Sequence, residues 1–268
     1  MEILPTPPAL WDIQAVAGTG AAVRRAHVIA IRPRWFLECP MPLAVKSASA
    51  PERIREPTGL DLMVRALEED IVLGRLHPRE RLVEDDLMAR FGATRHAIRQ
   101  ALMVLDRMGL VERVPNRGAQ VRSYTAEEVN ELYVLRALLE TEAARLIPLP
   151  LPAADLSEIR AIQRAHDAAV EAGDFAAIFR ANHAFHRKLF SCCGNRFLAH
   201  AIEAASERAH GIRFLVLTSA PEREKARRQH HAMIAALTAG DREALVDLCR
   251  DHLPASRNAY LRAFGATS

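Results

Sequence analysis

The sequence predicts a mainly α-helical protein in which a small winged helix-turn-helix with a short β-ribbon precedes a larger all-helical bundle. Half of the 268 residues are apolar but only 5% are aromatic. Ala and Leu dominate the C-terminal two thirds of the chain, a composition typical of packed helices. Two short strand-capable runs lie between residues 110 and 122, and the remaining folded part shows helical periodicity.

Three segments follow from this pattern. Residues 1–56 are rich in proline and show no persistent periodicity, so we expect a disordered extension. We expect residues 57–123 to form the winged domain and residues 124–268 to form the helical domain. The boundary is indicated by the capping-box pattern of Thr125-Ala-Glu-Glu128, which precedes an apolar-periodic run over 129–147.

The first domain shows the element order of a winged helix-turn-helix. A helix begins near Leu60 and stops near Gly74, and Thr94 is placed to cap a third helix that ends at Gly109. A tetrapeptide with the composition of a turn separates the two strand-capable runs. We expect a second helix over 83–91, strands over 110–113 and 119–122, and a turn over 115–118.

The second domain continues with five helices after the first one. Two of its breaks are the same tripeptide, Ala-Gly-Asp, at 172–174 and 239–241. In each, Gly can end one helix in the left-handed conformation while Asp caps the next helix, which predicts antiparallel neighbours. We expect these five helices over 153–172, 174–193, 195–218, 221–239 and 241–264.

Composition also limits the classes of protein. The four cysteines show no CxxC spacing. No apolar stretch reaches the length of a membrane span, and the N-terminus lacks the order of a signal peptide. We therefore expect a soluble cytoplasmic protein with no membrane partner.

The first domain carries a local excess of positive charge. Residues 87–122 hold seven arginines against two acidic residues, whereas the net charge of the whole chain is only +3. In a winged helix-turn-helix the third helix enters the major groove, and the N-terminal half of that helix reaches base edges or phosphates. The candidate DNA-binding residues are Thr94, Arg95, His96 and Arg99 on this helix, with Arg117 and Gly118 at the tip of the wing.

At these residues the chain resembles the GntR family of bacterial regulators. Two positions depart from the family pattern: His77-Pro-Arg replaces a usual Leu-Pro-Gly-like step, and Asp85-Asp86 lies where some members present Arg to DNA. The resemblance rests on Gly74-Arg-Leu-His-Pro-Arg-Glu-Arg-Leu-Val-Glu84, Leu87-Met-Ala-Arg-Phe-Gly92, Thr94-Arg-His-Ala-Ile-Arg-Gln-Ala-Leu102 and Gly109-Leu-Val-Glu-Arg-Val-Pro-Asn-Arg-Gly118.

Histidines in the second domain suggest a metal site. His186, His231 and His252 lie on three helices that could meet in a bundle, and imidazole suits Zn²⁺ or Ni²⁺. Spacing on helices also arises by coincidence, so buried histidines that make ordinary hydrogen bonds remain the alternative. We interpret their neighbours His183 and His230 as surface or supporting groups.

The second domain resembles the FCD effector domain of the FadR subfamily. In many members an Asp joins three His in holding a metal beside a carboxylate effector, and here that Asp position is Asn182. Because an amide oxygen is a poorer ligand than a carboxylate, the resemblance implies a site that binds metal more weakly, or none. It rests on Leu132-Tyr-Val-Leu-Arg-Ala-Leu-Leu-Glu140, Phe185-His186, Gly194-Asn195, His231-Ala-Met-Ile234 and Gly240-Asp241 through His252.

Arginines could receive an acidic effector near this site, because a guanidinium matches a carboxylate bidentately. Arg136 is the leading candidate, with an ion pair to Glu140 as the equal alternative. For Arg208 and Arg213 a structural salt bridge is the favoured interpretation.

Motif order and resemblance together predict a homodimeric transcription repressor. It would bind a pseudo-palindromic double-stranded operator and be released by a small acidic metabolite. Two alternatives stay open: a metal-dependent hydrolase, because a three-histidine metal site could activate water, and a DNA-binding protein that responds to no ligand.

Overall fold

The computed structural model describes residues 58–114 and 118–264. The proposed extension over 1–56 and the candidate DNA contact Arg117 lie outside the described residues.

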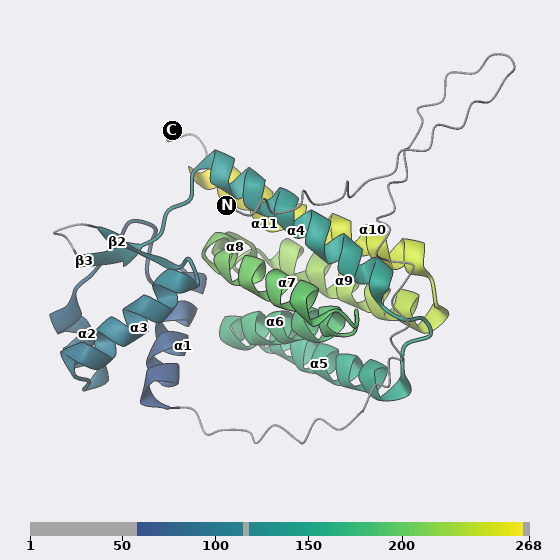
Figure 1. The fold of residues 1–268 in the computed structure, drawn as a ribbon, viewed down its shortest axis with the longest axis horizontal. Helices are drawn as coiled ribbons and strands as arrows, with labels where there is room; N and C mark the ends of the chain where they lie inside the picture. Colours follow the sequence, from purple (N-terminus) through teal and green to yellow (C-terminus); the bar gives the residue numbers. More distant parts are fainter. Residues whose placement is uncertain (1–57, 115–117, 265–268) are drawn as a thin grey trace, which may run out of the picture. The chain divides into compact units, whose positions relative to one another are not determined.

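The N-terminal part is a winged helix-turn-helix, as the sequence predicts (Figure 1). Its sheet is antiparallel in the order β1-β3-β2, and Glu112 pairs with Gln120 across the ribbon. The first strand was not predicted, because its two residues are too short to show a period. The elements are α1 (Gly59–Val72), β1 (Arg81–Leu82), α2 (Glu84–Phe91), α3 (Arg95–Arg107), β2 (Val111–Val114) and β3 (Gly118–Val121).

The apolar face of α3 holds this part together. Ile98, Ala101, Leu102 and Leu105 are buried at the spacing of one helix face, and they pack in one cluster with Leu67 of α1. The helix begins as predicted, because the Thr94 hydroxyl accepts a hydrogen bond from the N–H of Ala97 at 3.3 Å. The polar face of α3 is therefore left for solvent or a partner.

The C-terminal part is a bundle of eight helices within residues 126–264. α4 packs on α10 and α7, while α5 packs on α6 and α9 (Figure 1). Its core includes Phe185, Leu189, Met233 and Leu237, all buried in one cluster. The helices are α4 (Ala126–Leu146), α5 (Ala153–Ala172), α6 (Phe175–Ser191), α7 (Arg196–Arg208), α8 (His210–Leu217), α9 (Ala220–Ala239), α10 (Arg242–His252) and α11 (Pro254–Phe264).

The repeated Ala-Gly-Asp turns act as predicted. Gly173 and Gly240 have φ of 68° and 73°, in the left-handed region that glycine adopts without strain. The carboxylates of Asp174 and Asp241 accept hydrogen bonds from the first turns of α6 and α10. Two tight helix-to-helix turns are thus fixed by local chemistry alone.

Two predicted helices are each divided in the structure. The predicted helix over 195–218 is interrupted at Ala209, which lies between α7 and α8 and carries no breaker signal. The predicted helix over 241–264 is interrupted before Pro254, which lacks the N–H needed to continue the α10 hydrogen-bond ladder.

Tyr124 links the end of the wing to two distant segments. Its hydroxyl donates a hydrogen bond to the carbonyl of Gly109 at 2.7 Å. Its backbone N–H donates to the hydroxyl of Tyr260 on α11 at 3.0 Å. Burial raises the pKa of Tyr124 to about 12, so the hydroxyl keeps its proton and remains a donor.

No helix among the described residues combines the length and the apolar character that crossing a bilayer requires.

Candidate functional site

The exposed face of α3 carries the polar residues that the sequence selected. Arg95, His96 and Arg99 are exposed on the N-terminal half of the helix, and Thr94 is exposed as its cap. Gly118 begins β3 and lines a surface groove with Arg99 and other residues of α3 and the wing. Helix and wing thus border one groove, which suits a nucleic-acid backbone.

Both arginines of this face already have acidic partners on α2. Arg99 donates to the Glu84 carboxylate at 2.9 and 3.0 Å, and Arg95 is paired with Asp85. The hydrogen bond from Arg99 lowers the pKa of Glu84. Because these pairs are largely exposed, they hold the arginines weakly and can be exchanged for phosphate or base contacts.

Inside the C-terminal bundle three histidines converge on one point. His186 Nε2 lies 3.1 Å from His252 Nε2 and 3.3 Å from His230 Nε2. Two nitrogens that bind one tetrahedral zinc at about 2.0–2.1 Å lie about 3.3 Å apart, so both separations fit a shared ion. These three side chains, from α6, α9 and α10, could hold a metal ion.

Two glutamines fix the tautomers of this histidine cluster. Gln163 donates its amide to Asp167 at 2.8 Å, which leaves its amide oxygen to accept from His230 Nδ1 at 3.0 Å. Gln229 donates to the backbone carbonyl of Asp251 at 3.3 Å and accepts from His252 Nδ1 at 2.9 Å. Both histidines therefore present a bare Nε2 lone pair to the centre.

Burial keeps the cluster neutral. It lowers the pKa of His252 to about 3 and moves the pKa values of His186 and His230 well below the ordinary range. A proton on His186 Nε2 could satisfy only one of the two facing lone pairs, whereas a metal ion would satisfy all three nitrogens. The donor set therefore fits a divalent ion.

His231 was the wrong choice for this cluster, and His230 takes its place. The His231 side chain is 55% exposed and lies 3.1 Å from the Asp167 carboxylate. Adjacent helical residues point about 100° apart, so only one of the pair can face the bundle. His230 lies three, four and seven residues before the buried Met233, Ile234 and Leu237, a period that could have identified it.

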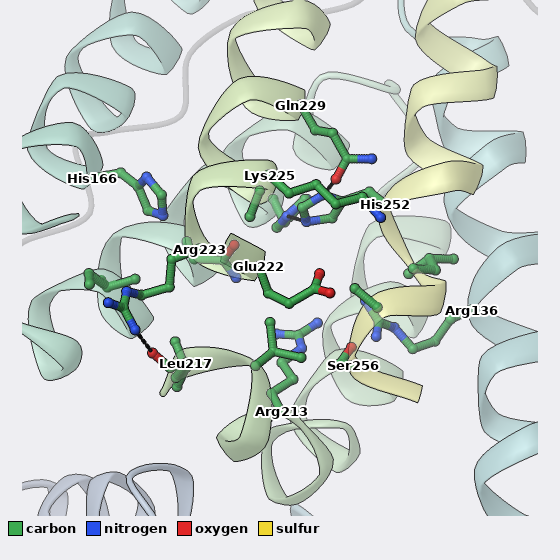
Figure 2. A pocket seen from close by; sticks show the side chains of 17 residues that line it. Arg136, His166, Arg213, Leu217, Glu222, Arg223, Lys225, Gln229, His252 and Ser256 are labelled. Atoms are coloured by element: carbon green, nitrogen blue, oxygen red, sulfur yellow. Dashed lines mark hydrogen bonds between the residues drawn. The ribbon is translucent and has the colours of Figure 1, made fainter. Parts of the chain in front are cut away.

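Asn182 lines a cavity beside the cluster. Arg136 and Arg213 line the same cavity (Figure 2). The side-chain amide of Asn182 makes no hydrogen bond to another described residue, which leaves its oxygen free for a ligand. Arg136 is buried in an ion pair with Glu140, with nitrogen-to-oxygen distances of 2.8 and 2.9 Å. The ion pair with Glu140 is therefore present, and Arg136 also lines the cavity, so its contact with an effector stays a prediction.

Arg213 lines this cavity without an acidic partner among the described residues, as do Arg223 and Lys225. The Nη2 of Arg213 donates to the Ser206 hydroxyl at 3.1 Å, and its Nη1 is buried without a partner. Neither Arg213 nor Arg208 forms an ion pair with a described residue, so the salt bridge expected for each is wrong. Arg208 donates to the backbone carbonyl of Ala204 and does not line the cavity. Burial and the nearby Arg136 lower the pKa of Arg213 to about 10, and it stays charged at neutral pH.

A hydrogen bond joins α8 to α1 of the winged domain. His210 donates from Nδ1 to the Glu68 carboxylate of α1 at 2.7 Å, and its ring packs edge-on against His183. His183 is itself 3.2 Å from Glu203 and is half-buried, which fits the supporting role that was one of the two expected for it. Because Arg213 lies three residues after His210, one short helix reaches both the cavity and α1.

A winged helix-turn-helix joined to a helical domain with a charged cavity defines the class of DNA-binding transcription regulators that sense small molecules. Residues 63–121 match the family described as bacterial regulatory proteins, gntR family, and residues 131–255 match the FCD domain. The chain belongs to the GntR family and carries an FCD effector domain.

Similar proteins have the same architecture. The chain is 29% identical over 182 residues to the uncharacterized HTH-type transcriptional regulator YdhC of Bacillus subtilis, which covers 66% of this chain and 80% of that protein. It is 28% identical over 200 residues to the HTH-type transcriptional repressor GlaR of Escherichia coli, covering 70% and 90%. A GntR regulator structure from Rhodococcus has a TM-score of 0.65 at 25% identity, covering 76% of this chain and 98% of that one.

The relatives are transcription regulators, and the chain belongs with them and not with enzymes. The hydrolase alternative is thereby excluded.

We predict that His230→Ala removes bound metal and that His231→Ala does not. Removing His230 deletes one of three convergent nitrogens, whereas His231 lies outside the cluster. Elemental analysis of the purified proteins checks this, with about one equivalent of metal per chain expected for the wild type and for His231→Ala. Retention of metal by His230→Ala would contradict the prediction.

Proposed function

We propose that this protein is a cytoplasmic homodimeric repressor that binds a pseudo-palindromic operator and is released by a small carboxylate. The observation that carries the ligand class is the cavity itself, where a buried Arg213 without a carboxylate partner lies beside neutral, convergent histidines. A repressor role is supported by the similarity to GlaR, a transcriptional repressor that matches over 70% of this chain. We assign DNA binding to residues 57–123 and ligand binding with dimerisation to residues 124–268.

The cavity would hold its ligand through two kinds of positive charge. His186, His230 and His252 would hold a divalent ion such as zinc or nickel, which supplies a Lewis-acid centre for a carboxylate oxygen. Arg213 can donate two parallel hydrogen bonds to the same carboxylate. Asn182 would complete the metal site through a neutral oxygen, which weakens the binding of metal compared with Asp.

On the DNA side we infer that Arg95 and Arg99 exchange their acidic partners for the operator. Thr94 and His96 lie beside them on the same face, and Gly118 allows the wing backbone to approach a phosphate. Such an exchange makes the gain per arginine the difference between two ionic contacts. Because each neutralised phosphate releases counterions, operator affinity should fall as salt rises.

We propose that release passes through α8. A ligand that engages Arg213 acts on a helix of eight residues whose first residue, His210, is bonded to Glu68 of the winged domain. An effector can change operator affinity only if it binds the DNA-competent and the DNA-incompetent arrangement of the domains unequally. If the winged domain moves between these arrangements, the bond from His210 to Glu68 differs between them.

Dimerisation is proposed through the outer face of α4. Val134, Leu135 and Leu138 are 58%, 47% and 65% exposed there, although large apolar side chains are normally covered. Glu131 and Arg145 lie seven residues before and after Leu138. Two antiparallel copies of α4 that cross at Leu138 would therefore pair Glu131 of each copy with Arg145 of the other.

We predict that Arg99→Ala weakens operator binding by about 1–3 kcal/mol, or about 5- to 150-fold, if Arg99 reads a base. The measurement is fluorescence anisotropy with a duplex that the wild-type protein selects from a random pool. Arg250→Ala is the matched control, because Arg250 is an exposed arginine of α10 far from this face in sequence. Equal affinity of wild type and Arg99→Ala would remove Arg99 from the interface.

We predict that a carboxylate releases the wild-type protein from this duplex and that Glu68→Gln reduces the release without abolishing ligand binding. The amide keeps the shape of the side chain but weakens the bond to His210. Anisotropy and calorimetry with a panel of C2–C6 mono- and dicarboxylates measure the two effects separately. Glu171→Gln, which alters only an exposed ion pair with Arg227, is the control.

Operator affinity that no carboxylate, metal or chelator changes would support the other remaining alternative, a DNA-binding protein that responds to no ligand.

We predict that Leu138→Glu converts the dimer to a monomer. The variant places two like charges opposite each other on the two-fold axis, which costs more than the lost apolar contact alone. Light scattering after size exclusion gives the mass. Leu62→Glu alters a comparably exposed leucine, 55% exposed on α1, and should stay dimeric. A dimeric Leu138→Glu would place the interface elsewhere.

A further inference from the structure

The cavity contains one carboxylate that the proposed function does not use. Glu222 lines the cavity from the first turn of α9, and Figure 2 shows it reaching inward, with Arg213 on one side and His252 on the other in this view. Its Oε2 atom is buried, and the side chain forms no hydrogen bond or ion pair with any described residue. A buried acceptor without a partner destabilises the unliganded protein, so its retention calls for an explanation.

The position of Glu222 in the helix does not explain why its Oε2 atom is buried. An acidic residue in the first turn is favoured by the helix dipole, but an exposed side chain serves that purpose equally well. Glu243 illustrates this in the first turn of α10, where it is exposed. The inward orientation of Glu222 therefore points to a group that enters the cavity.

Other unpartnered atoms in the same cavity show which chemistry is missing. Arg213 Nη1 and Arg223 Nε are buried donors without acceptors, while Glu222 Oε2 is a buried acceptor without a donor. A molecule that satisfies all of them needs both acceptor oxygens and at least one donor. A simple carboxylate supplies only the acceptors.

This inference rests on the proposed role of the cavity as the effector site. We propose that the effector is a short aliphatic acid that also carries an ammonium or hydroxyl group. This group donates a hydrogen bond to Glu222. Four basic side chains and a single carboxylate line the cavity, so the ligand remains anionic or zwitterionic. The walls that surround these polar groups fit a short carbon chain, because they are formed by Ile178, Val216, Leu217, Ala226, Leu253 and Ala255.

Glu222 is not assigned to the metal. The three histidines offer ligand nitrogens that all lie within 4.8 Å of one another, and no carboxylate among the described residues joins that group. A carboxylate that stands apart from the metal ligands, yet in the same cavity, is placed for a different part of the bound molecule.

The test is calorimetric titration of the full-length protein with matched acids, without DNA. Two sets are used: butyrate, 2-hydroxybutyrate and 2-aminobutyrate, then succinate, malate and aspartate. In at least one set we expect the wild type to bind the hydroxy or amino acid about tenfold or more tightly than the plain acid, since a hydrogen bond to a charged group contributes that much. Whichever substituted acid binds tighter identifies the donor as hydroxyl or ammonium.

Glu222→Gln should bring an amino-acid preference to within about threefold of the plain acid, because the amide has no charge to attract the ammonium. Glu222→Ala should also remove a hydroxy-acid preference, which a glutamine oxygen could partly retain. Glu243→Gln, the exposed first-turn acid of α10, should keep the wild-type ratio. Thermal melts and metal content of each variant are measured alongside.

Several results would overturn the proposal. These are equal binding of plain and substituted acids by the wild type, binding of none of the six acids, or an unchanged ratio in Glu222→Ala. Loss of metal in Glu222→Gln would also overturn it, because it would make Glu222 a metal ligand. Because the titrations contain no DNA, failure to bind an operator would refute the repressor function and leave this result intact.

Discussion

The hydrogen bonds from His230 and His252 to the amide oxygens of Gln163 and Gln229 determine what the centre of the C-terminal domain can bind. Each amide is itself oriented by a second bond, so the direction of the imidazole protons is fixed before any ligand arrives. Buried imidazoles in another tautomer would donate to the centre and repel a cation. The packing of α5, α6, α9 and α10 thus keeps two neutral acceptor nitrogens, of His230 and His252, facing His186.

The charged side chains of α3 and those of the cavity differ in exposure and in pairing. On α3 the arginines are exposed and paired with acids of α2, so they rest in a satisfied state that solvent and salt can disturb. In the cavity Arg213 Nη1 and Glu222 Oε2 are buried atoms without a hydrogen-bond partner, and solvent does not reach them. The first arrangement suits a contact that must be made and broken along DNA, and the second suits selection of one small molecule.

Sequence reasoning succeeded where local chemistry decides the structure. The Ala-Gly-Asp turns, the Thr94 and Thr125 caps and the buried face of α3 all follow from residues within one or two turns. The break at Ala209 carries no such signal, because it depends on how α7 and α8 pack against other elements.

The candidate site was predicted less well because it is assembled from distant helices. His186 and His252 were predicted to meet, and they do. The third histidine was predicted to be His231, but its neighbour His230 is the residue of α9 that faces the cluster. Gln163, Gln229 and Glu222 belong to no motif and are remote in sequence from the residues that they support or accompany, so the sequence did not indicate them. The apolar period around Met233 was the one available signal for His230.

The bonding of Tyr124 sets an energy scale for any movement of the winged domain. The segment after the wing is not a free hinge, since its tyrosine is held at the hydroxyl by Gly109 and at the backbone by Tyr260. Each such bond contributes about 0.5–1.5 kcal/mol net. The Tyr260 hydroxyl also donates to the carbonyl of Tyr124 at 3.3 Å, so breaking all three bonds would cost about 1.5–4.5 kcal/mol. One ligand commonly alters the affinity for another by a comparable coupling energy of about 1–3 kcal/mol. A switch built on this joint needs only a modest difference in ligand affinity to work, and removal of either tyrosine hydroxyl would shift its resting position even without ligand.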